Sequence, residues 1–329
     1  MKYQKKLEFL MDEFELIKNY FQKLTKNNPS ALNLNDDVFF DKKNKIIISI
    51  DTYNEGIHFL NFKKPHKVIK KIIRSSISDI ICKGVKPKFF FLSGSGSKKH
   101  FSKKNFKLIS KSINEEQKKY DIKLSGGDTT FSKKSSFTVV ALGLSKKIVK
   151  RNNVKINDDI YVTGNLGDSF IGLNVLKKKI NINKKYNNYF INKYFFPELP
   201  IKLHKYLNKI ANSSIDISDG LFADLNKLIN DQKVGYNLYL NKIPISKKLS
   251  FYLKNNNKKP INFISKGDDY QILFSSPKRN RKYIKNLAKR INQKITFIGT
   301  ITNIYKQRKL VNYEKQLKPL KYKGYLHKF

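Results

Sequence analysis

One short stretch in the second half of the chain, Ser214–Asp224 (SIDISDGLFAD), constrains the fold more than any other. Ile215 and Ile217 alternate with polar residues, which predicts a short buried strand. Gly220 follows and permits a backbone angle that other residues rarely adopt, as a tight turn requires. Apolar residues then recur at helical spacing over 221–229. The stretch therefore predicts a strand, a turn and a helix in direct succession.

The polar residues of this stretch fall where the strand ends and the helix begins. Asp216, Ser218 and Asp219 are therefore expected to lie close together. Carboxylates at such a point can hold a hard cation, while the free amides and the positive end of the helix favour phosphate oxygens. A capping role for Ser218 or Asp219 explains the same residues. The stretch alone leaves both interpretations open.

The charge of the chain points first to nucleic acid as a partner. The formal net charge is +43 over 329 residues, and basic surfaces bind phosphate backbones. Lysine supplies nearly all of this charge, however, since arginine occurs only at positions 74, 151, 279, 281, 290 and 308. The lysines are spread over the whole length and form no clustered basic and aromatic motif. We therefore expect no specific nucleic-acid partner.

Length and hydropathy favour a two-domain protein that does not enter a membrane. A chain of 329 residues exceeds the usual size of a single domain. No uninterrupted apolar run approaches membrane-spanning length, and the charged residues 1–6 lead into an amphipathic pattern rather than a secretory segment. The lone Cys82 excludes an intrachain disulfide and fits a reducing compartment. A cytoplasmic location is expected.

Helices and strands are predicted in mixed order along the chain. Residues 14–24 predict an amphipathic helix whose role is packing, and residues 27–41 predict a loop. Further helices are predicted over 65–83, 103–120, 170–176, 221–229 and 281–291. Strands are predicted over 45–51, 88–92, 122–124, 136–144, 159–163, 214–217, 236–240, 271–274 and 295–301.

Two lysine-rich segments interrupt this pattern. The basic connector 146–155 predicts a domain boundary, which divides the chain into residues 1–147 and 148–329. The segment 177–193, rich in lysine and asparagine, predicts a solvated insertion. Whether that insertion moves as a lid is left open by the sequence.

Lysine is absent from five windows that hold almost every acidic motif: 27–41, 46–62, 124–132, 156–176 and 210–226. Burial explains the isoleucine-rich parts of these windows. It does not explain Asp36-Asp37, Asp128 or Asp216, because unpaired aspartates are seldom buried without a compensating cation. Aspartates at strand ends with no basic neighbour in sequence predict shared divalent ions. Magnesium fits carboxylate and phosphate oxygen ligands best.

Seven motifs stand in an order that resembles thiamine-monophosphate kinase, a branch of the aminoimidazole ribonucleotide synthetase-like superfamily of ATP-binding enzymes. They are Asn35-Asp36-Asp37, Asp51-Thr52-x-Asn54-Glu55-Gly56-x-His58-Phe59, Ser78-Asp79, Gly126-Gly127-Asp128, Thr163-Gly164-x-Leu166-Gly167-Asp168-Ser169, Asp216-x-Ser218-Asp219-Gly220-Leu221 and Gly267-Asp268-Asp269-Tyr270. The motif over 51–59 is the one that points to the thiamine branch.

The resemblance implies an α+β, two-domain aminoimidazole ribonucleotide synthetase-like fold. It implies that the N-terminal domain (1–147) binds ATP and magnesium and forms a homodimer, and that the C-terminal α/β sandwich-like domain (148–329) completes the nucleotide and substrate site. Magnesium ligands carried over from the family are Asp37, Ser49, Asp51, Asp79, Asp128, Asp216 and Asp219. Nucleotide contacts carried over are Gly127, Asp128, Arg151 and Ser218, and contacts to thiamine monophosphate are His58, Asp268 and Tyr325.

The chain departs from the family pattern at several of these positions. Lys266-Gly267-Asp268-Asp269-Tyr270 stands where the family usually has Gly-Gly-Glu-Asp-Tyr, so the carboxylate expected to reach the substrate is one methylene shorter. Ser76 replaces the asparagine of Asn-x-Ser-Asp, and Asn35 replaces the glycine of Gly-Asp-Asp. The C-terminal Gly-aromatic-x-His-Phe pattern is one residue longer.

The activity implied is in-line transfer of the γ-phosphoryl group of ATP to thiamine monophosphate, with several Mg²⁺ ions. No protein nucleophile is expected, because the acceptor is already an anionic phosphate oxygen that needs positioning and charge neutralisation. His58 is interpreted as a binding residue. Two alternatives stay open: a sister enzyme of the superfamily acting on another acceptor, and a basic RNA-associated protein without enzymatic activity.

Overall fold

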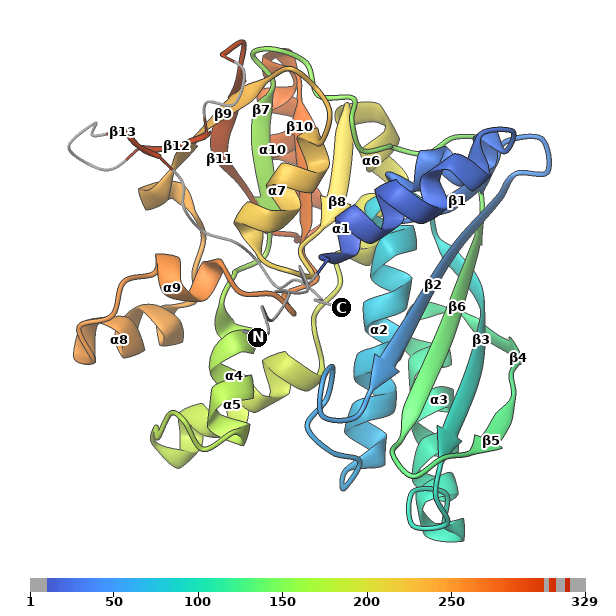
Figure 1. The fold of residues 1–329 in the computed structure, drawn as a ribbon. Coiled ribbons are helices and arrows are strands. Elements are labelled where there is room, and N and C mark those ends of the chain that lie inside the picture. The colour runs from blue at the N-terminus through green and yellow to red at the C-terminus, as the bar shows by residue number, and fades with distance from the viewer. Residues whose placement is uncertain (1–10, 305–307, 312–316, 320–329) are drawn as a thin grey trace, which may run out of the picture.

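The computed structural model of the chain describes residues 11–304, 308–311 and 317–319. These residues form two β-sheets with helices packed on them, and helix α2 (Pro65–Cys82) lies between the sheets (Figure 1). The described residues contain no helix long and apolar enough to cross a bilayer.

The first sheet is formed in the N-terminal half. Its strands lie in the order β1 (Phe39–Asp41), β2 (Ile46–Asn54), β6 (Ser136–Leu144), β3 (Pro87–Gly96) and β4 (Lys123–Gly126), and β5 (Thr129–Phe131) also pairs with β3. Only the pairs of β3 with β4 and β5 are parallel. Side chains alternate along β2, so that Ile47, Ser49 and Tyr53 are buried while Ile50 is exposed.

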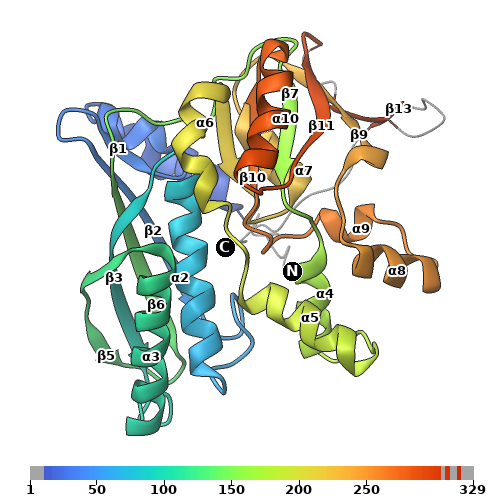
Figure 2. The ribbon, with the colours of Figure 1, turned by 180° about the vertical axis from the view of Figure 1, so that it is seen from behind.

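Helices α2 and α3 (Lys103–Tyr120) cover one face of this sheet, as Figure 2 shows from behind. Isoleucines at 69, 72, 73, 77, 80 and 81 fill the buried sides of α2, and each is at most 1% exposed. Pro65 stands in the first turn, where its missing N–H costs nothing. A helix buried on so many sides is held in a fixed position, which fixes the polar groups that it carries.

The second sheet has the strand order β13 (Leu317–Pro319), β12 (Arg308–Val311), β9 (Gly235–Tyr239), β11 (Ile295–Thr302), β7 (Asp159–Thr163), β10 (Ile272–Ser276) and β8 (Ser213–Asp216). All neighbours are antiparallel except β12 and β9. Helix α7 (Leu221–Ile229) packs on one face, while α6 (His204–Ile210) and α10 (Arg281–Arg290) lie on the other (Figures 1 and 2).

A group of smaller helices extends from the second sheet: α4 (Asp168–Leu176), α5 (Lys184–Phe195), α8 (Lys247–Asn255) and α9 (Ile261–Ile264). They share a small core that includes Ile171, Phe190 and Leu249. The expectation of a merely solvated insertion over 177–193 is therefore wrong. Most of α5 falls within that segment, and its Phe190 is fully buried.

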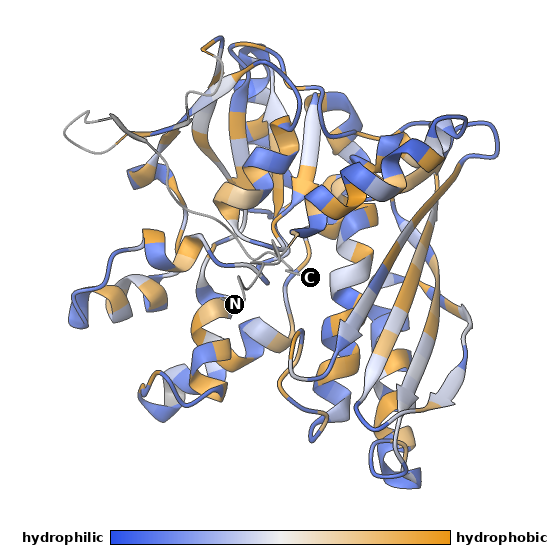
Figure 3. Cartoon of the chain, in the orientation of Figure 1, coloured by the Kyte–Doolittle hydropathy of each residue, from blue (hydrophilic) through white to orange (hydrophobic). Residues whose placement is uncertain are grey.

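Most of the predicted elements are confirmed, including the strand, turn and helix over 214–229. The predicted loop over 27–41 contains strand β1. The first segment is helical, as α1 (Glu13–Leu16) followed by a π-helical and a 3₁₀ turn. Its expected packing is wrong for the described chain, because Leu24 is 79% exposed. Figure 3 maps the hydrophilic and apolar residues of the described part of the chain.

One hydrophobic cluster joins the two halves. It contains Ile77 of α2 and Val139 of β6 together with Phe274 of β10, so the core under the first sheet continues against one face of the second. The last strand of the first sheet ends at Leu144 and the first strand of the second begins at Asp159. A boundary at residues 147 and 148 stays a prediction.

Candidate functional site

Three aspartates from distant parts of the sequence meet between the two sheets. One carboxylate oxygen from each of Asp37, Asp79 and Asp216 lies within 4.8 Å of the other two. Asp37 precedes β1, Asp79 lies near the end of α2, and Asp216 ends β8. They meet because α2 packs against both β2 and β8. Together they offer a hard divalent cation the oxygen ligands that it prefers.

Hydroxyl groups fix the direction of two of these carboxylates. The hydroxyl of Ser49 on β2 donates to Asp79 Oδ2 at 2.5 Å. The hydroxyl of Ser78 donates to Asp216 Oδ2 at 2.7 Å. Asp51, two residues after Ser49 and on the same face of β2, lies beside Asp79 within hydrogen-bonding reach of Ser76. The cluster thus holds four carboxylates on three secondary-structure elements and one preceding turn.

Burial makes this cluster electrostatically unfavourable without a cation. It raises the pKa of the Asp216 carboxyl to about 6. Burial, with the negative charges of Asp51 and Asp216, raises the pKa of Asp79 well above its ordinary value. In the described ranges, no lysine or arginine forms an ion pair with Asp51, Asp79 or Asp216. Acids held in this way mark a functional site, because a fold gains no stability from them.

Asp37 has basic partners, unlike the other members of the cluster. The buried Lys83 Nζ lies 2.5 Å from Asp37 Oδ2 and 2.7 Å from Asp36 Oδ1. Arg151 Nε donates to Asp37 Oδ2 at 3.1 Å. Burial alone would lower the pKa of the Lys83 ammonium, and Asp36 is the main group that raises it instead. Arg151, expected to contact nucleotide, is therefore tied to a predicted metal ligand.

The absence of basic partners inferred from the sequence is thus wrong for Asp36, Asp37 and Asp219. The carboxylate of Asp219 forms an ion pair with Lys227. Lys227 lies one residue beyond its lysine-free window, and the second turn of α7 brings it back to Asp219. Lys83 reaches Asp36 from the end of α2. Tertiary and helical contacts, which spacing along the chain does not show, supply these cations.

The turn before α7 is built differently from the capping alternative. Gly220 is the N-cap residue, and neither Ser218 nor Asp219 caps the helix with its side chain. Asp224 accepts hydrogen bonds from the backbone N–H groups of Asp219 and Gly220 at 3.0 Å each. Gly220 has a φ of +114°, and a Cβ there would lie 2.4 Å from the carbonyl oxygen of Ser265. The side chains of Ser218 and Asp219 are thereby released from capping.

Gly127 and Asp128 lie at the other edge of the first sheet. Asp128 is exposed, and one of its carboxylate oxygens accepts from the N–H of Thr129 at 2.8 Å. A Cβ at Gly127 would lie 2.0 Å from the carbonyl oxygen of Leu92, so close packing on β3 requires glycine there. The structure does not bring Asp128 into the group formed by Asp37, Asp79 and Asp216.

The residues predicted to bind substrate stand on two separate loops. His58 Nδ1 accepts from the N–H of Asn54 at 2.9 Å, which fixes the imidazole ring. Asp268 adopts a φ of +68°, and its Oδ1 accepts from the hydroxyl of Tyr270 at 3.0 Å. The N–H of Asp268 donates to the carbonyl oxygen of Ser218 at 2.9 Å, which joins this loop to the turn before α7. Tyr325 lies outside the described residues.

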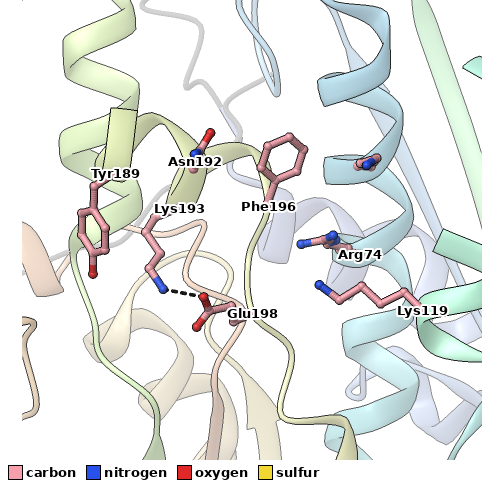
Figure 4. Close-up of a pocket in the computed structure, with 8 residues that line it drawn as sticks. Arg74, Lys119, Tyr189, Asn192, Lys193, Phe196 and Glu198 are labelled. Carbon is pink, nitrogen blue, oxygen red and sulfur yellow. Dashed lines mark ion pairs between the residues drawn. The ribbon is translucent and has the colours of Figure 1, made fainter. Parts of the chain in front are cut away.

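A separate pocket of about 430 Å³ lies between α2, α3 and α5 (Figure 4). Its cationic side chains are largely paired: Arg74 Nε lies 2.8 Å from Glu116 Oε2, and Lys193 Nζ lies 2.9 Å from Glu198 Oε1. No predicted site residue lines this pocket. The pocket is therefore distinct from the acidic cluster.

Comparison with known proteins relates the cluster to a family. Residues 34–145 match the family described as AIR synthase related protein, N-terminal domain. The thiamine-monophosphate kinase of Buchnera aphidicola subsp. Acyrthosiphon pisum (strain APS) is 37% identical over 329 residues, covering 96% of this chain and 98% of its own. That of Aquifex aeolicus (strain VF5) is 31% identical over 235 residues, covering 71% and 76%. This chain belongs to the thiamine-monophosphate kinase family.

Solved structures extend the comparison to the whole fold. AaThiL complexed with AMPPCP and TMP has a TM-score of 0.83 and 27% identity, and the match covers 99% of each chain. A chain of the HypE-HypF complex has a TM-score of 0.75 at 15% identity, covering 94% of this chain and 99% of its own, so the fold extends beyond thiamine-monophosphate kinases. The predicted α+β, aminoimidazole ribonucleotide synthetase-like fold is confirmed.

Sequence reasoning missed three basic residues that pair with acids of the predicted motifs: Lys71, Lys83 and Lys227. A signal for Lys71 was available, because residues 71, 75, 78 and 79 recur at helical spacing and share the face of α2 that carries Asp79. Lys71 Nζ lies 2.8 Å from Asp268 Oδ1. This signal is weak in a chain with lysines over its whole length, because composition does not distinguish a buried lysine from a solvated one.

Proposed function

We propose that this chain transfers the γ-phosphoryl group of ATP to the phosphate of thiamine monophosphate, giving thiamine diphosphate and ADP. The buried aspartates without ion-pair partners, between α2, β2 and β8, are the observation that carries the proposal. Phosphoryl transfer from ATP needs positive charge beside the phosphate oxygens, and a cluster of aspartates supplies it by binding metal ions. Support comes from relatives named thiamine-monophosphate kinase and from a structural neighbour that holds AMPPCP and TMP.

We assign the magnesium ions to the acidic cluster. Asp37, Asp51, Asp79 and Asp216 would hold them with the hydroxyl of Ser49, and Asp128 and Asp219 are further candidate ligands on neighbouring segments. Their chemistry fits, since hard oxygen donors predominate and, among the described residues, three of the acids form no ion pair with a lysine or arginine. Bound Mg²⁺ supplies neutralisation of phosphate charge. For Asp219 the proposal requires release from Lys227.

The remaining predicted residues are assigned to the two substrates. Gly127, Asp128, Arg151 and Ser218 would contact the nucleotide, and His58, Asp268 and Tyr325 would contact thiamine monophosphate. No protein nucleophile takes part, because the acceptor phosphate is anionic at neutral pH and direct transfer needs only alignment and charge neutralisation. The protein's own contribution is therefore to hold both substrates between the two sheets.

We also propose a homodimer formed through the first sheet. Within the described ranges, the face of this sheet opposite α2 and α3 carries no helix (Figures 1 and 2). Large apolar side chains are exposed on these strands: Ile50, Phe89, Phe91, Leu124, Phe131 and Leu144. An apolar surface of this kind is typical of an interface between protein chains. A second copy of the chain, seated on the same strands, would cover it.

A panel of acceptors tests the proposed reaction. ADP release from ATP and Mg²⁺ is measured with thiamine monophosphate, with unphosphorylated thiamine and with the acceptors of sister enzymes of the superfamily. The proposal requires release only with thiamine monophosphate. Release with a sister-enzyme acceptor alone would support the first alternative, and salt-sensitive RNA binding without any ATP turnover would support the second.

A further inference from the structure

We propose that Lys71 is a positioning residue of the substrate site, which holds Asp268 directly and His58 through Tyr194. This inference deepens the proposed function and rests on it. Lys71 belongs to α2, Asp268 to a loop of the second half, and Tyr194 to α5. The side chain therefore connects three parts of the molecule at the place where both halves meet the substrate.

The contact with Asp268 is an ion pair between a buried lysine and a carboxylate whose side chain is 27% exposed. Lys71 Nζ lies 2.8 Å from Asp268 Oδ1, and the lysine side chain is 2% exposed. In the described part of the chain, Asp268 is the acidic partner of this ammonium. A buried charge is costly unless it is paired, so the lysine and the carboxylate hold each other in place.

Tyr194 links the same ammonium to the second substrate loop. Lys71 Nζ lies 3.6 Å from the centroid of the Tyr194 ring, a cation–π contact in a desolvated environment. The hydroxyl of Tyr194 donates to the carbonyl oxygen of His58 at 3.1 Å. Lys71 thus lies between the two described residues predicted to contact thiamine monophosphate.

Polar side chains lie between this ion pair and the acidic cluster. The hydroxyl of Tyr270 donates to Asp268 Oδ1, the oxygen that faces Lys71. Burial raises the pKa of the Tyr53 and Tyr270 hydroxyls, and Ser75, one turn after Lys71 on α2, lies near both tyrosines and acts to lower it. The hydroxyls of Tyr53 and Ser76 are 2.9 Å apart, and Ser76 reaches Asp51. Polar side chains therefore extend from the substrate loop toward the proposed metal ligand Asp51.

Lys71 and Tyr270 together orient the carboxylate of Asp268, which is one methylene shorter than the usual family glutamate. An aspartate side chain on a backbone with a φ of +68° has a direction set by its partners. Lys71 and Tyr270 supply two such partners on one oxygen, Oδ1, so the proposal assigns Oδ2 to the substrate. Without Lys71 the carboxylate would be free to rotate. Binding of thiamine monophosphate would then be weaker, because the side chain would lose conformational entropy on binding.

The test is the kinetic constants of Lys71→Met, which keeps the length of the side chain and removes its charge. We expect KM for thiamine monophosphate to rise about tenfold, with KM for ATP and kcat within about threefold of wild type. Lys71→Arg should recover part of the loss. The stabilisation of Tm by thiamine monophosphate without ATP should fall in parallel, which is a readout independent of turnover.

Lys70→Met is the matched control. Lys70 is the adjacent residue on α2 and forms its ion pair with Glu115 on α3, away from the substrate loops. Its substitution should leave all constants close to wild type. If wild type converts thiamine monophosphate and Lys71→Met keeps the wild-type KM and Tm shift, the inference on Lys71 is wrong. If wild type itself does not convert this substrate, the proposed function fails, and the inference fails with it.

A second variant decides the matter if Lys71→Met does not fold. Tyr194→Phe keeps the ring under Lys71 and removes only the hydroxyl that donates to His58. The inference requires a selective rise in KM for thiamine monophosphate of about threefold or more in this variant. Unchanged constants in Tyr194→Phe would show that the link to His58 carries no positioning and would overturn the proposal.

Discussion

The hydroxyl of Ser78 on α2 donates to Asp216 Oδ2 on β8 at 2.7 Å, which joins the first half of the chain to the second within the acidic cluster. This contact is made while burial raises the pKa of Asp216 to about 6. The Asp216 carboxylate is thus held in a fixed direction, although its burial disfavours the ionised form. Such an arrangement suits a ligand that brings positive charge.

The metal-free protein should become more stable when Asp216 is replaced by Asn. The folded-state pKa of about 6 lies above the ordinary 3.8, so ionisation of Asp216 lowers the free energy of unfolding as pH rises through this window. Above about pH 7 the penalty is fully present, and at about pH 4 it is nearly gone. Asp216→Asn should therefore raise the free energy of unfolding by about 1–3 kcal/mol at about pH 8 and change it little at about pH 4.

Urea unfolding in the presence of a chelator measures this effect. Asp121→Asn is the control, because Asp121 is exposed and its pKa is lowered by a side-chain hydrogen bond from Lys86. That substitution should not stabilise the protein at either pH. A loss of stability in Asp216→Asn at about pH 8 would contradict the electrostatic account of the cluster.

Asp51→Asn should abolish turnover while leaving the fold intact. Asn retains a hydrogen-bond acceptor for Ser76 but coordinates magnesium more weakly than a carboxylate does. We expect kcat to fall at least about 100-fold, with an unchanged circular dichroism spectrum. Activity near that of wild type at saturating Mg²⁺ would remove Asp51 from the proposed metal ligands.

Asp268→Glu, which restores the usual family residue, should raise KM for thiamine monophosphate. The shorter carboxylate already reaches Lys71 and Tyr270, so an added methylene would push these partners apart. KM for ATP should change little. Measurement of both constants checks this, and a lower KM for thiamine monophosphate would show instead that the shorter side chain leaves a gap toward the substrate.

The proposed dimer predicts that Ile50→Asp produces monomers. Ile50 is 67% exposed on β2 and faces away from α2, so a carboxylate there would be desolvated at the interface. Light scattering coupled to size exclusion measures the molecular mass at micromolar concentration. Phe251→Asp, at an apolar residue of α8 that is 52% exposed, is the control and should stay dimeric. A monomeric wild type would contradict the proposal directly.

The sequence predicted those parts of the fold that depend on local pattern. The strand and helix around Gly220 follow from alternation, helical spacing and a glycine that close packing on Ser265 requires. Local pattern also suggested which acids to examine, because lysine is excluded from their windows. It was misleading for α5, where lysines and asparagines on one side conceal the buried Phe190 on the other.

The partners of the acids could not be predicted in the same way. Lys83 reaches Asp36 only because α2 packs against β2 and β8, and Lys71 reaches Asp268 across the two halves of the chain. In a chain so rich in lysine, composition does not distinguish a buried ammonium from a solvated one. Burial and tertiary contacts make that distinction, and they come from the structure.

Transfer of labelled phosphate tests the central proposal most directly. Purified protein is incubated with ATP labelled in its γ-phosphate, Mg²⁺ and thiamine monophosphate, and labelled thiamine diphosphate is quantified beside ADP. The account predicts labelled thiamine diphosphate and ADP in equal amounts, with neither formed when Mg²⁺ is chelated. ADP without labelled thiamine diphosphate, or product formation that persists without divalent metal, would contradict it.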